Sequence, residues 1–181
     1  MLYDLAIIGA GWAGVNAAHR AAQLGLKTVL FEKGDLGGTC LNRGCIPTKA
    51  LLQSAKVFSL SKKSKNFGVI VKDTGIDFAQ IQARKDALIR QLRLGVEYML
   101  KDTEVIHQEA KVVSGQIVSV GNRQITAQAI IVASGSRPME LPAIKPDGKK
   151  IVSSDQILDL DKLPQSLLII GGGVIGWEFA P

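Results

Sequence analysis

The chain has 181 residues, the length of one domain or slightly more, and it carries a net charge of +6. Hydrophobic residues make up 46% and charged residues 21%, a normal globular balance, and no apolar run reaches the ~18 residues that a membrane span needs. Aromatic residues are only 5% and do not alternate with the modest lysine cluster of residues 56–65. We therefore interpret that cluster as a solvated loop, and we expect neither a nucleic acid nor a membrane as a partner.

The N-terminal residues are apolar but lack the basic segment of a secretion signal, and they run directly into a glycine turn. We therefore expect a cytoplasmic protein, or an equivalent in an organelle matrix. In such a reducing compartment a close pair of cysteines is more often catalytic or metal-binding than structural.

The first pattern along the chain is a strand, a glycine turn, a helix and a second strand. Residues 3–8 form a short apolar run without helical period, residues 9–14 read G-x-G-x-x-G, and an alanine-rich helix ends near Gly25. Residues 27–31 predict the second strand, and Glu32 follows it. This order predicts a parallel βαβ unit within an α/β fold.

Each glycine of this turn has a physical reason. Gly9 allows the tight turn, Gly11 lets the backbone approach a pyrophosphate, and Gly14 lets the helix pack closely on the sheet. The helix N-terminus offers free N–H groups to phosphates, and Glu32 can accept hydrogen bonds from ribose hydroxyls. The combination predicts dinucleotide binding; the alternative is a tight turn that binds no ligand.

The two cysteines of the sequence lie close together in the run GGTCLNRGCIPTK, residues 37–49. Pro47 fits the first turn of a helix, and apolar residues recur at helical spacing after it. Cys45 is therefore predicted at or near a helix N-terminus, where the helix dipole favours a thiolate. Lys49 follows four residues later on the same helical face and adds positive charge there.

Three interpretations of Cys40 and Cys45 compete. Half of a zinc site would need two further ligands, and neither His19 nor His107 has ligand spacing, so we expect no metal. A structural disulfide would close too short a loop to add much stability and is disfavoured in a reducing compartment. A redox-cycling pair is the interpretation that we favour.

The middle of the chain predicts one amphipathic helix. Residues 77–80 carry a capping-box signature, and the helix runs to about residue 100 with Lys85 on a face away from its apolar stripe. The stripe consists of Ile81, Leu88, Leu92, Val96 and Met99.

Short strands follow this helix. Four β-like runs between residues 104 and 126 predict an inserted antiparallel meander. Residues 129–133 predict a buried strand that leads into a turn at Ser134, Gly135 and Ser136. Ligands bind at such strand ends in open α/β sheets.

A second glycine fingerprint stands near the end of the chain. Residues 138–165 predict a linker with one helical turn at 155–160, and residues 166–170 predict a strand. Gly171, Gly173 and Gly176 then repeat the G-x-G-x-x-G pattern. We therefore divide the chain into a first domain, residues 1–145, and a linker with the start of a second dinucleotide-binding domain, residues 146–181.

The order of these motifs resembles the flavin-dependent pyridine nucleotide–disulfide oxidoreductases. It consists of the first fingerprint with Glu32, G-G-T-C-L-N-x-G-C-I-P-x-K, an A-x-G-S-x-P turn and G-G-G-x-I-G-x-E. The run LNRGCIPTKALL, residues 41–52, is most similar to the dihydrolipoamide dehydrogenases, with mercuric and glutathione-type reductases as alternatives. The resemblance covers the whole chain and implies a Rossmann-like FAD-binding domain, followed by the first strand of an NAD-binding domain.

The resemblance also implies the residues of the site. FAD would lie extended along the first fingerprint, NAD or NADP would lie on the second, a substrate dithiol would attack Cys40, and Cys45 would face the flavin. The residues implied for FAD are Gly9, Gly11, Gly14, Glu32, Lys33, Gly38, Thr39, Lys49, Ala110, Ser134, Gly135 and Ser136, and those for NAD are Gly171, Gly173, Gly176 and Glu178.

Members of this family are more than twice as long, so the resemblance implies that the chain is the N-terminal part of a longer protein. A second copy in a homodimer, a lipoyl domain or small dithiol as substrate, and a 2-oxoacid dehydrogenase complex are the implied partners. The family's catalytic histidine would lie in the C-terminal domain and serve the other subunit's disulfide. Two hypotheses follow: a FAD- and NAD-dependent dihydrolipoamide dehydrogenase or, for the chain as given, an inactive flavin-binding fragment.

Overall fold

The computed structural model describes residues 2–180 and divides into two compact units. The first unit comprises Met1–Asn42 and Arg90–Arg137, and the second comprises Arg43–Ile89 and Pro138–Pro181. Among the described residues, no helix is long and apolar enough to cross a membrane.

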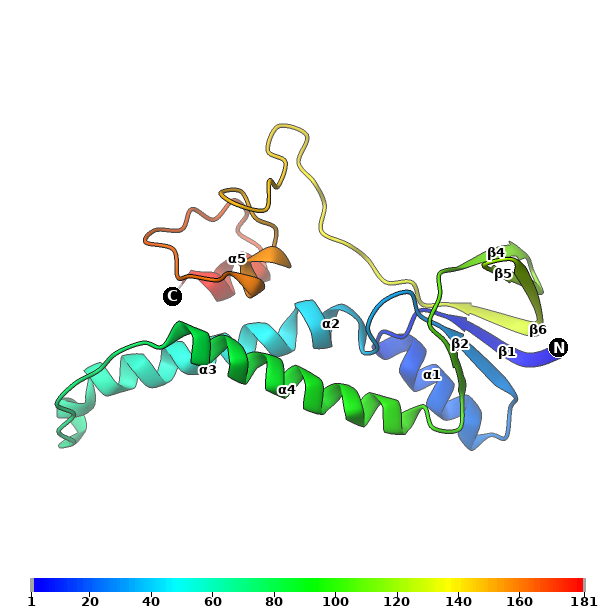
Figure 1. The fold of residues 1–181 in the computed structure, drawn as a ribbon, viewed down its shortest axis with the longest axis horizontal. Helices are drawn as coiled ribbons and strands as arrows, with labels where there is room; N and C mark the ends of the chain where they lie inside the picture. Colours follow the sequence, from blue (N-terminus) through cyan, green and yellow to red (C-terminus); the bar gives the residue numbers. More distant parts are fainter. Residues whose placement is uncertain (1, 181) are drawn as a thin grey trace. The chain divides into compact units, whose positions relative to one another are not determined.

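A six-stranded sheet forms the first unit, in the order β3-β2-β1-β6-β5-β4 (Figure 1). The parallel strands are β1 (Leu2–Ile8), β2 (Thr28–Phe31), β3 (Glu104–Ile106) and β6 (Arg123–Val132). Beyond β6, the strands β5 (Ile117–Val120) and β4 (Ala110–Ser114) continue the sheet in antiparallel pairing. The predicted α/β fold is confirmed.

The strand β1 lies between β2 and β6, and most of its residues are apolar. Ile7 is fully buried and stands opposite Leu30 of β2 and Ile131 of β6. The helix α1 (Trp12–Gln23) packs against β1 and β2 through residues that include the buried Val15 and Ala18. Burying one Ile or Val side chain stabilises a fold by about 1.5–3 kcal/mol, so this contact holds the glycine turn between β1 and α1 in place.

The prediction of an antiparallel meander was wrong for its first strand, β3. β3 pairs parallel with β2, with Val29 opposite Glu104, and only β4, β5 and β6 form the meander. Alternation along a strand does not identify its neighbour. The preceding helix α4 (Phe78–Met99) makes a crossover connection, which returns the chain parallel to β2. The two strands predicted within residues 123–133 are one strand, β6, which pairs with β5 and β1.

The second unit contains helices and irregular segments. Its elements are α3 (Cys45–Lys62), the 3₁₀ helix η1 (Ser64–Phe67), the first half of α4, η2 (Gln156–Asp159) and α5 (Val174–Phe179). The predicted cap of α4 is confirmed, since the N–H of Gln80 donates to Asp77 Oδ1 at 2.9 Å. Arg84 of α4 donates to the carbonyl of Ala50 in α3 at 3.5 Å, so these helices lie alongside each other (Figure 1).

Lys85 is buried in the second unit, although we expected it on a face of α4 away from the core. Its Nζ donates to the carbonyl of Leu158 at 2.9 Å and pairs with Asp159 at 2.6 Å and with Asp86 at 3.2 Å. A buried ammonium group is tolerated where acceptors replace the lost water. These contacts hold α4 against η2. The presence of η2 confirms the helical turn predicted at residues 155–160.

Residues 166–170 do not form the strand that was predicted to open the second domain. Leu168 is 86% exposed and Ile170 is 59% exposed. Within its described residues, the second unit has no other strand that could pair with this segment. A lone strand leaves its backbone N–H and C=O groups without partners, so the apolar sequence alone does not produce one.

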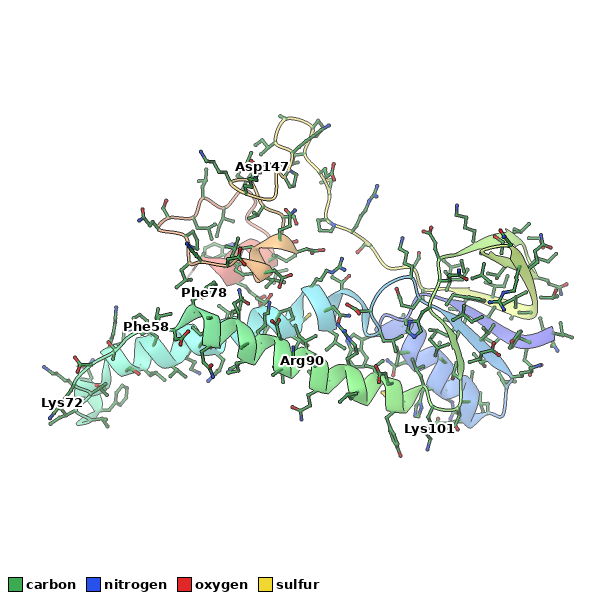
Figure 2. All side chains as sticks on the ribbon, viewed as in Figure 1. Phe58, Lys72, Phe78, Arg90, Lys101 and Asp147 are labelled. Atoms are coloured by element: carbon green, nitrogen blue, oxygen red, sulfur yellow. The ribbon has the colours of Figure 1, made fainter. Side chains whose placement is uncertain are left out.

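Asp147 organises a turn ahead of η2 (Figure 2). Its Oδ1 accepts hydrogen bonds from the backbone N–H groups of Lys149 and Lys150 at 2.8 Å and of Ile151 at 2.9 Å. The N–H of Ile151, followed by that of Lys149, holds the pKa of Asp147 below its usual range, because these donors favour the ionised carboxylate. The turn gives the predicted linker a local structure.

Candidate functional site

The first glycine fingerprint adopts a backbone that a larger residue would disrupt. Gly9 has φ +103°, and a Cβ added there would lie 2.3 Å from the carbonyl oxygen of Ala133. A Cβ on Gly14 would lie 1.8 Å from the carbonyl oxygen of Gly9. Gly11 caps α1 in an extended conformation, and its carbonyl accepts from the N–H of Val15 at 2.9 Å. The turn therefore directs the N-terminus of α1, with its unpaired N–H groups, to the edge where β1 ends.

Glu32 connects the end of β2 to this turn. Its Oε2 accepts a hydrogen bond from the N–H of Ala10 at 2.7 Å, and its Oε1 accepts one from the N–H of Gly34 at 2.8 Å. Each carboxylate oxygen can accept a second hydrogen bond, so the group is fixed and still able to receive hydroxyl donors.

A small cavity of about 120 Å³ lies where strands of the parallel sheet end. Its lining residues are Ile8, Gly9, Phe31, Glu32, Lys33, Gln108, Glu109, Ala110 and Ser134. Five of the residues predicted for FAD are thus brought to one place: Gly9, Glu32, Lys33, Ala110 and Ser134. Pockets for whole small molecules have volumes of about 300–1,000 Å³, so this cavity suits one part of an extended ligand.

Two residues of this cavity, Gln108 and Glu109, escaped prediction as site residues because no motif marks them. Glu109 pairs with Lys33 at 3.2 Å, with both side chains largely exposed. The N–H of Gln108 donates to the carbonyl of Ile106 at 2.9 Å and turns the chain out of β3. The signal that could have found them is the parallel pairing of β3, since ligands bind beyond the carboxyl ends of parallel strands.

The glycine pair that precedes the cysteines lies on the first fingerprint. Gly37 and Gly38 have φ of +98° and +64°. The N–H of Gly37 donates to the carbonyl of Ala10 at 2.8 Å, and a Cβ on Gly38 would lie 2.6 Å from the Cα of Gly11. This contact places Gly38 beside the turn, and Thr39 follows it in the chain.

Each cysteine lies on its own helix. Cys40 is half-buried in α2 (Gly38–Arg43), and Cys45 is exposed as the first residue of α3. The predicted helix start is confirmed, with Pro47 buried in the first turn. The first turn of α3 contains no acidic residue, so no carboxylate of that turn offsets the positive end of the helix dipole.

The second fingerprint repeats the backbone of the first. Gly171 has φ +120°, Gly173 caps α5 in an extended conformation, and a Cβ on Gly176 would lie 2.4 Å from the carbonyl oxygen of Gly171. The helix α5 that follows carries Glu178, whose carboxylate forms an ion pair with Lys49 of α3. The pair joins a residue predicted for FAD to one predicted for NAD.

The turn after β6 leads away from the same sheet edge. The N–H of Ala133 donates to the carbonyl of Ile8 at 2.8 Å, which brings Ser134 into the cavity beside Gly9. Gly135 has φ +68°, and Ser136 follows it. Within residues 2–180, no group of three or more His, Cys, Asp or Glu side chains is arranged to hold a metal ion. His19 contacts the carbonyl of Met99 at 3.1 Å instead.

Comparison with known proteins gives consistent matches. Residues 3–181 match the family model described as pyridine nucleotide-disulphide oxidoreductase. The chain is 41% identical to a dihydrolipoyl dehydrogenase of Bacillus subtilis (strain 168) and 45% identical to one of Chlorobaculum tepidum, with 98% of the chain covered in each case. It spans about two fifths of the length of these relatives, 41% and 39% respectively.

A solved structure gives the same result at the level of the fold. The Cu(II) complex of the HOCl-induced flavoprotein disulfide reductase RclA from Escherichia coli matches with a TM-score of 0.80 and 30% identity, over 97% of this chain and 38% of that one. Because the family match extends over nearly the whole sequence, and the fingerprints and the cysteine pair fall within it, the chain belongs to the pyridine nucleotide-disulphide oxidoreductase family.

Proposed function

We propose that this chain carries the FAD-binding and redox-disulfide part of a dihydrolipoyl dehydrogenase. The proposal rests on the cavity at the sheet edge, which Gly9, Glu32 and Ser134 line together. The similarity to dihydrolipoyl dehydrogenases favours this function over a mercuric or glutathione-type reductase. Because the chain spans only about two fifths of those relatives, turnover is proposed for the longer protein.

The contacts proposed for an extended FAD come from the first unit, apart from Lys49. The close approach of Gly38 to Gly11 leaves no room for a side chain at Gly38 and keeps the turn open to a pyrophosphate. Glu32 and Lys33 would hold the ribose, Ala110 would offer its backbone to the adenine, and the fingerprint would hold the phosphates. The remaining contacts are assigned to Gly38, Thr39, Lys49, Ser134, Gly135 and Ser136. FAD, when bound, supplies a reversible acceptor for two electrons.

The chemistry proposed for the cysteines is thiol–disulfide exchange. A thiolate of the substrate dithiol attacks the sulfur of Cys40 in the oxidised pair, forms a mixed disulfide and releases Cys45 as a thiolate. The second substrate thiolate then displaces Cys40, so the substrate leaves as a disulfide and the pair has gained two electrons. Cys45 is the thiolate that benefits from the N-terminus of α3, where positive charge favours it.

The second fingerprint is proposed as the start of the NAD site, through Gly171, Gly173, Gly176 and Glu178. Glu178 pairs with Lys49 in this structure, so its contact with NAD remains a prediction. The choice between NAD and NADP depends on residues beyond the second fingerprint. For the longer protein we propose a homodimer that takes lipoyl domains or small dithiols within a 2-oxoacid dehydrogenase complex. The domain division at residue 145 and the cytoplasmic location also remain predictions.

One preparation tests the proposed function. The purified chain is mixed with FAD, passed over a desalting column and analysed for retained flavin, and NADH-linked lipoamide turnover is then measured. We expect about one FAD per chain. Flavin retention without turnover would assign flavin binding to this chain and catalysis to the longer protein, whereas a chain that retains no flavin would contradict the proposal.

A further inference from the structure

The segment that carries Cys40 is held at both ends by one arginine of α4. Arg93 donates from Nη2 to the side-chain oxygen of Asn42 at 2.7 Å, and its Nη1 pairs with Asp35 at 3.1 Å. Asp35 and Asn42 lie on either side of Cys40 in the sequence and belong, like Arg93, to the first unit. The planar guanidinium suits this task because its donors diverge in a fixed geometry.

Asn42 in turn forms hydrogen bonds with the backbone that precedes Cys40. Its amide nitrogen donates to the carbonyls of Leu36 at 2.9 Å and Gly38 at 3.0 Å, while its oxygen accepts from Arg93. All three contacts use different atoms or lone pairs of one amide, so they can be made at once. Arg93, Asn42 and the 36–38 backbone therefore form one connected hydrogen-bonded network.

The position of the segment depends on contacts with the rest of the first unit, and this network is one of them. α2 has only six residues, too few to be stable as an isolated helix. Gly37 and Gly38, which lead into it, have more conformational freedom than any other residue type. Arg93 itself is mostly buried, and its Nε is buried without an acceptor among the described residues, so its orientation is fixed by the two contacts it makes.

We propose that Arg93 is a positioning residue for the redox pair: through Asn42 and Asp35 it fixes the short helix of Cys40 and so raises the tendency of Cys40 to form a disulfide with Cys45. This inference rests on the proposed function of the two cysteines. A disulfide forms only when its sulfur atoms meet in a narrow geometry. On this proposal the network holds Cys40 where that geometry can be reached, which raises its effective concentration toward Cys45.

The test is the equilibrium between the 181-residue chain and glutathione. Glutathione disulfide takes two electrons from the Cys40 and Cys45 thiols, their two protons are released to form two glutathione molecules, and one intramolecular disulfide remains. After acid quenching and alkylation, mass spectrometry of the peptide that holds both cysteines gives the oxidised fraction. The variants are Arg93→Gln, Arg93→Lys and Asp35→Asn. Arg90→Gln is the matched control, because Arg90 is exposed on the same helix (Figure 2) and makes no hydrogen bond or ion pair among the described residues.

For Arg93→Gln we expect the disulfide equilibrium constant to fall about tenfold, which moves the midpoint potential by about 30 mV to a less negative value. Arg93→Lys keeps the charge but cannot reach both acceptors, and Asp35→Asn weakens the ion pair with Arg93. In each of these variants we expect the disulfide equilibrium constant to fall about threefold. Arg90→Gln should match the unmodified chain.

Several results would overturn the proposal. These are an unchanged constant in Arg93→Gln, full recovery in Arg93→Lys, or an equal fall in Arg90→Gln, which would mean that net charge alone matters. If Arg93→Gln does not fold, the exposed Asp35→Asn variant decides the question by its own shift. If the cysteines form no intramolecular disulfide in any redox buffer, the proposed function itself is contradicted. If the disulfide forms but its equilibrium constant does not change in the Arg93 variants, only the role of Arg93 is contradicted.

Discussion

Lys49 and Glu178 form an ion pair between α3, the helix that Cys45 begins, and α5, the helix that follows the second glycine fingerprint. The two residues are 129 positions apart in the sequence. Lys49 is one helical turn from Cys45, so the pair connects the first turns of α3 to the helix that follows the second fingerprint.

Removing the carboxylate of this pair should cost little stability. The Lys49 side chain is 57% exposed, and exposed ion pairs contribute about 0.2–1 kcal/mol. We therefore expect a double-mutant cycle of Lys49→Gln and Glu178→Gln, measured by urea unfolding, to give a coupling in that range that shrinks in 1 M salt. FAD affinity of Glu178→Gln should stay unchanged, and a large loss would show that Glu178 contributes to the flavin site.

Gly14→Ala should disrupt the first fingerprint. The new Cβ would lie 1.8 Å from the carbonyl oxygen of Gly9, a distance that forces the backbone to move. We expect the free energy of unfolding to fall by about 2–3 kcal/mol and FAD binding to be lost. Gly95→Ala is the control, since nothing lies within 4 Å of its Cβ in α4, and it should stabilise the chain by about 0.5–1 kcal/mol. Equal effects at both sites would contradict this account of the turn.

Glu32→Gln should weaken FAD binding without unfolding the sheet. The N–H groups of Ala10 and Gly34 hold the carboxylate in place, and in the proposed site it also accepts a hydrogen bond from a ribose hydroxyl. A hydrogen bond to a charged group contributes about 1.5–3 kcal/mol. A loss of that size raises the dissociation constant about 10- to 100-fold, which a flavin fluorescence titration can measure. Glu97→Gln changes an exposed carboxylate of α4 and should leave the constant unchanged. An unaltered constant for Glu32→Gln would remove Glu32 from the site.

Tyr3 should make the stability of the first unit sensitive to alkaline pH. Its hydroxyl donates to Glu104 at 2.6 Å, and this hydrogen bond, together with burial and the charge of Glu104, raises the pKa of Tyr3 to about 12. Unfolded tyrosine loses its proton near pH 10, so the stabilisation is complete below about pH 10 and is lost between about pH 10 and 12.

Tyr3→Phe tests this pH dependence. At pH 7 we expect unfolding to become easier by about 1–2 kcal/mol, because a hydrogen bond to a charged acceptor is lost. The variant should also lack the part of the alkaline decline that Tyr3 causes. Tyr98→Phe is the control, since Tyr98 is 70% exposed, and its denaturation curves should follow those of the unmodified chain at each pH. A decline that persists unchanged in Tyr3→Phe would mean that other groups cause it.

Local chemistry made part of the fold predictable. The fingerprint turn could be predicted because Gly9 and Gly14 have no substitute in that backbone. The start of α3 could be predicted because Pro47 and the apolar spacing act within one turn. Both signals depend only on neighbouring residues.

Contacts between distant segments account for the rest. Lys85 is charged, and nothing near it in the sequence indicates that Asp159 and Leu158 will enclose it. β3 has the alternation of a meander strand, yet the crossover through α4 determines its parallel partner. Arg93 is an ordinary helix residue until the fold brings it to Asn42. Short sequence windows contain none of these pairings.

We propose that the first unit binds FAD and that Cys40 and Cys45 form a reversible redox pair. The most direct measurement combines flavin content with a thiol count before and after reduction by dihydrolipoamide. We predict about one FAD per chain, no titratable thiol in the oxidised chain and two after reduction, with the flavin retained throughout. A chain that holds no flavin, or whose thiol count does not change on reduction, would contradict the account.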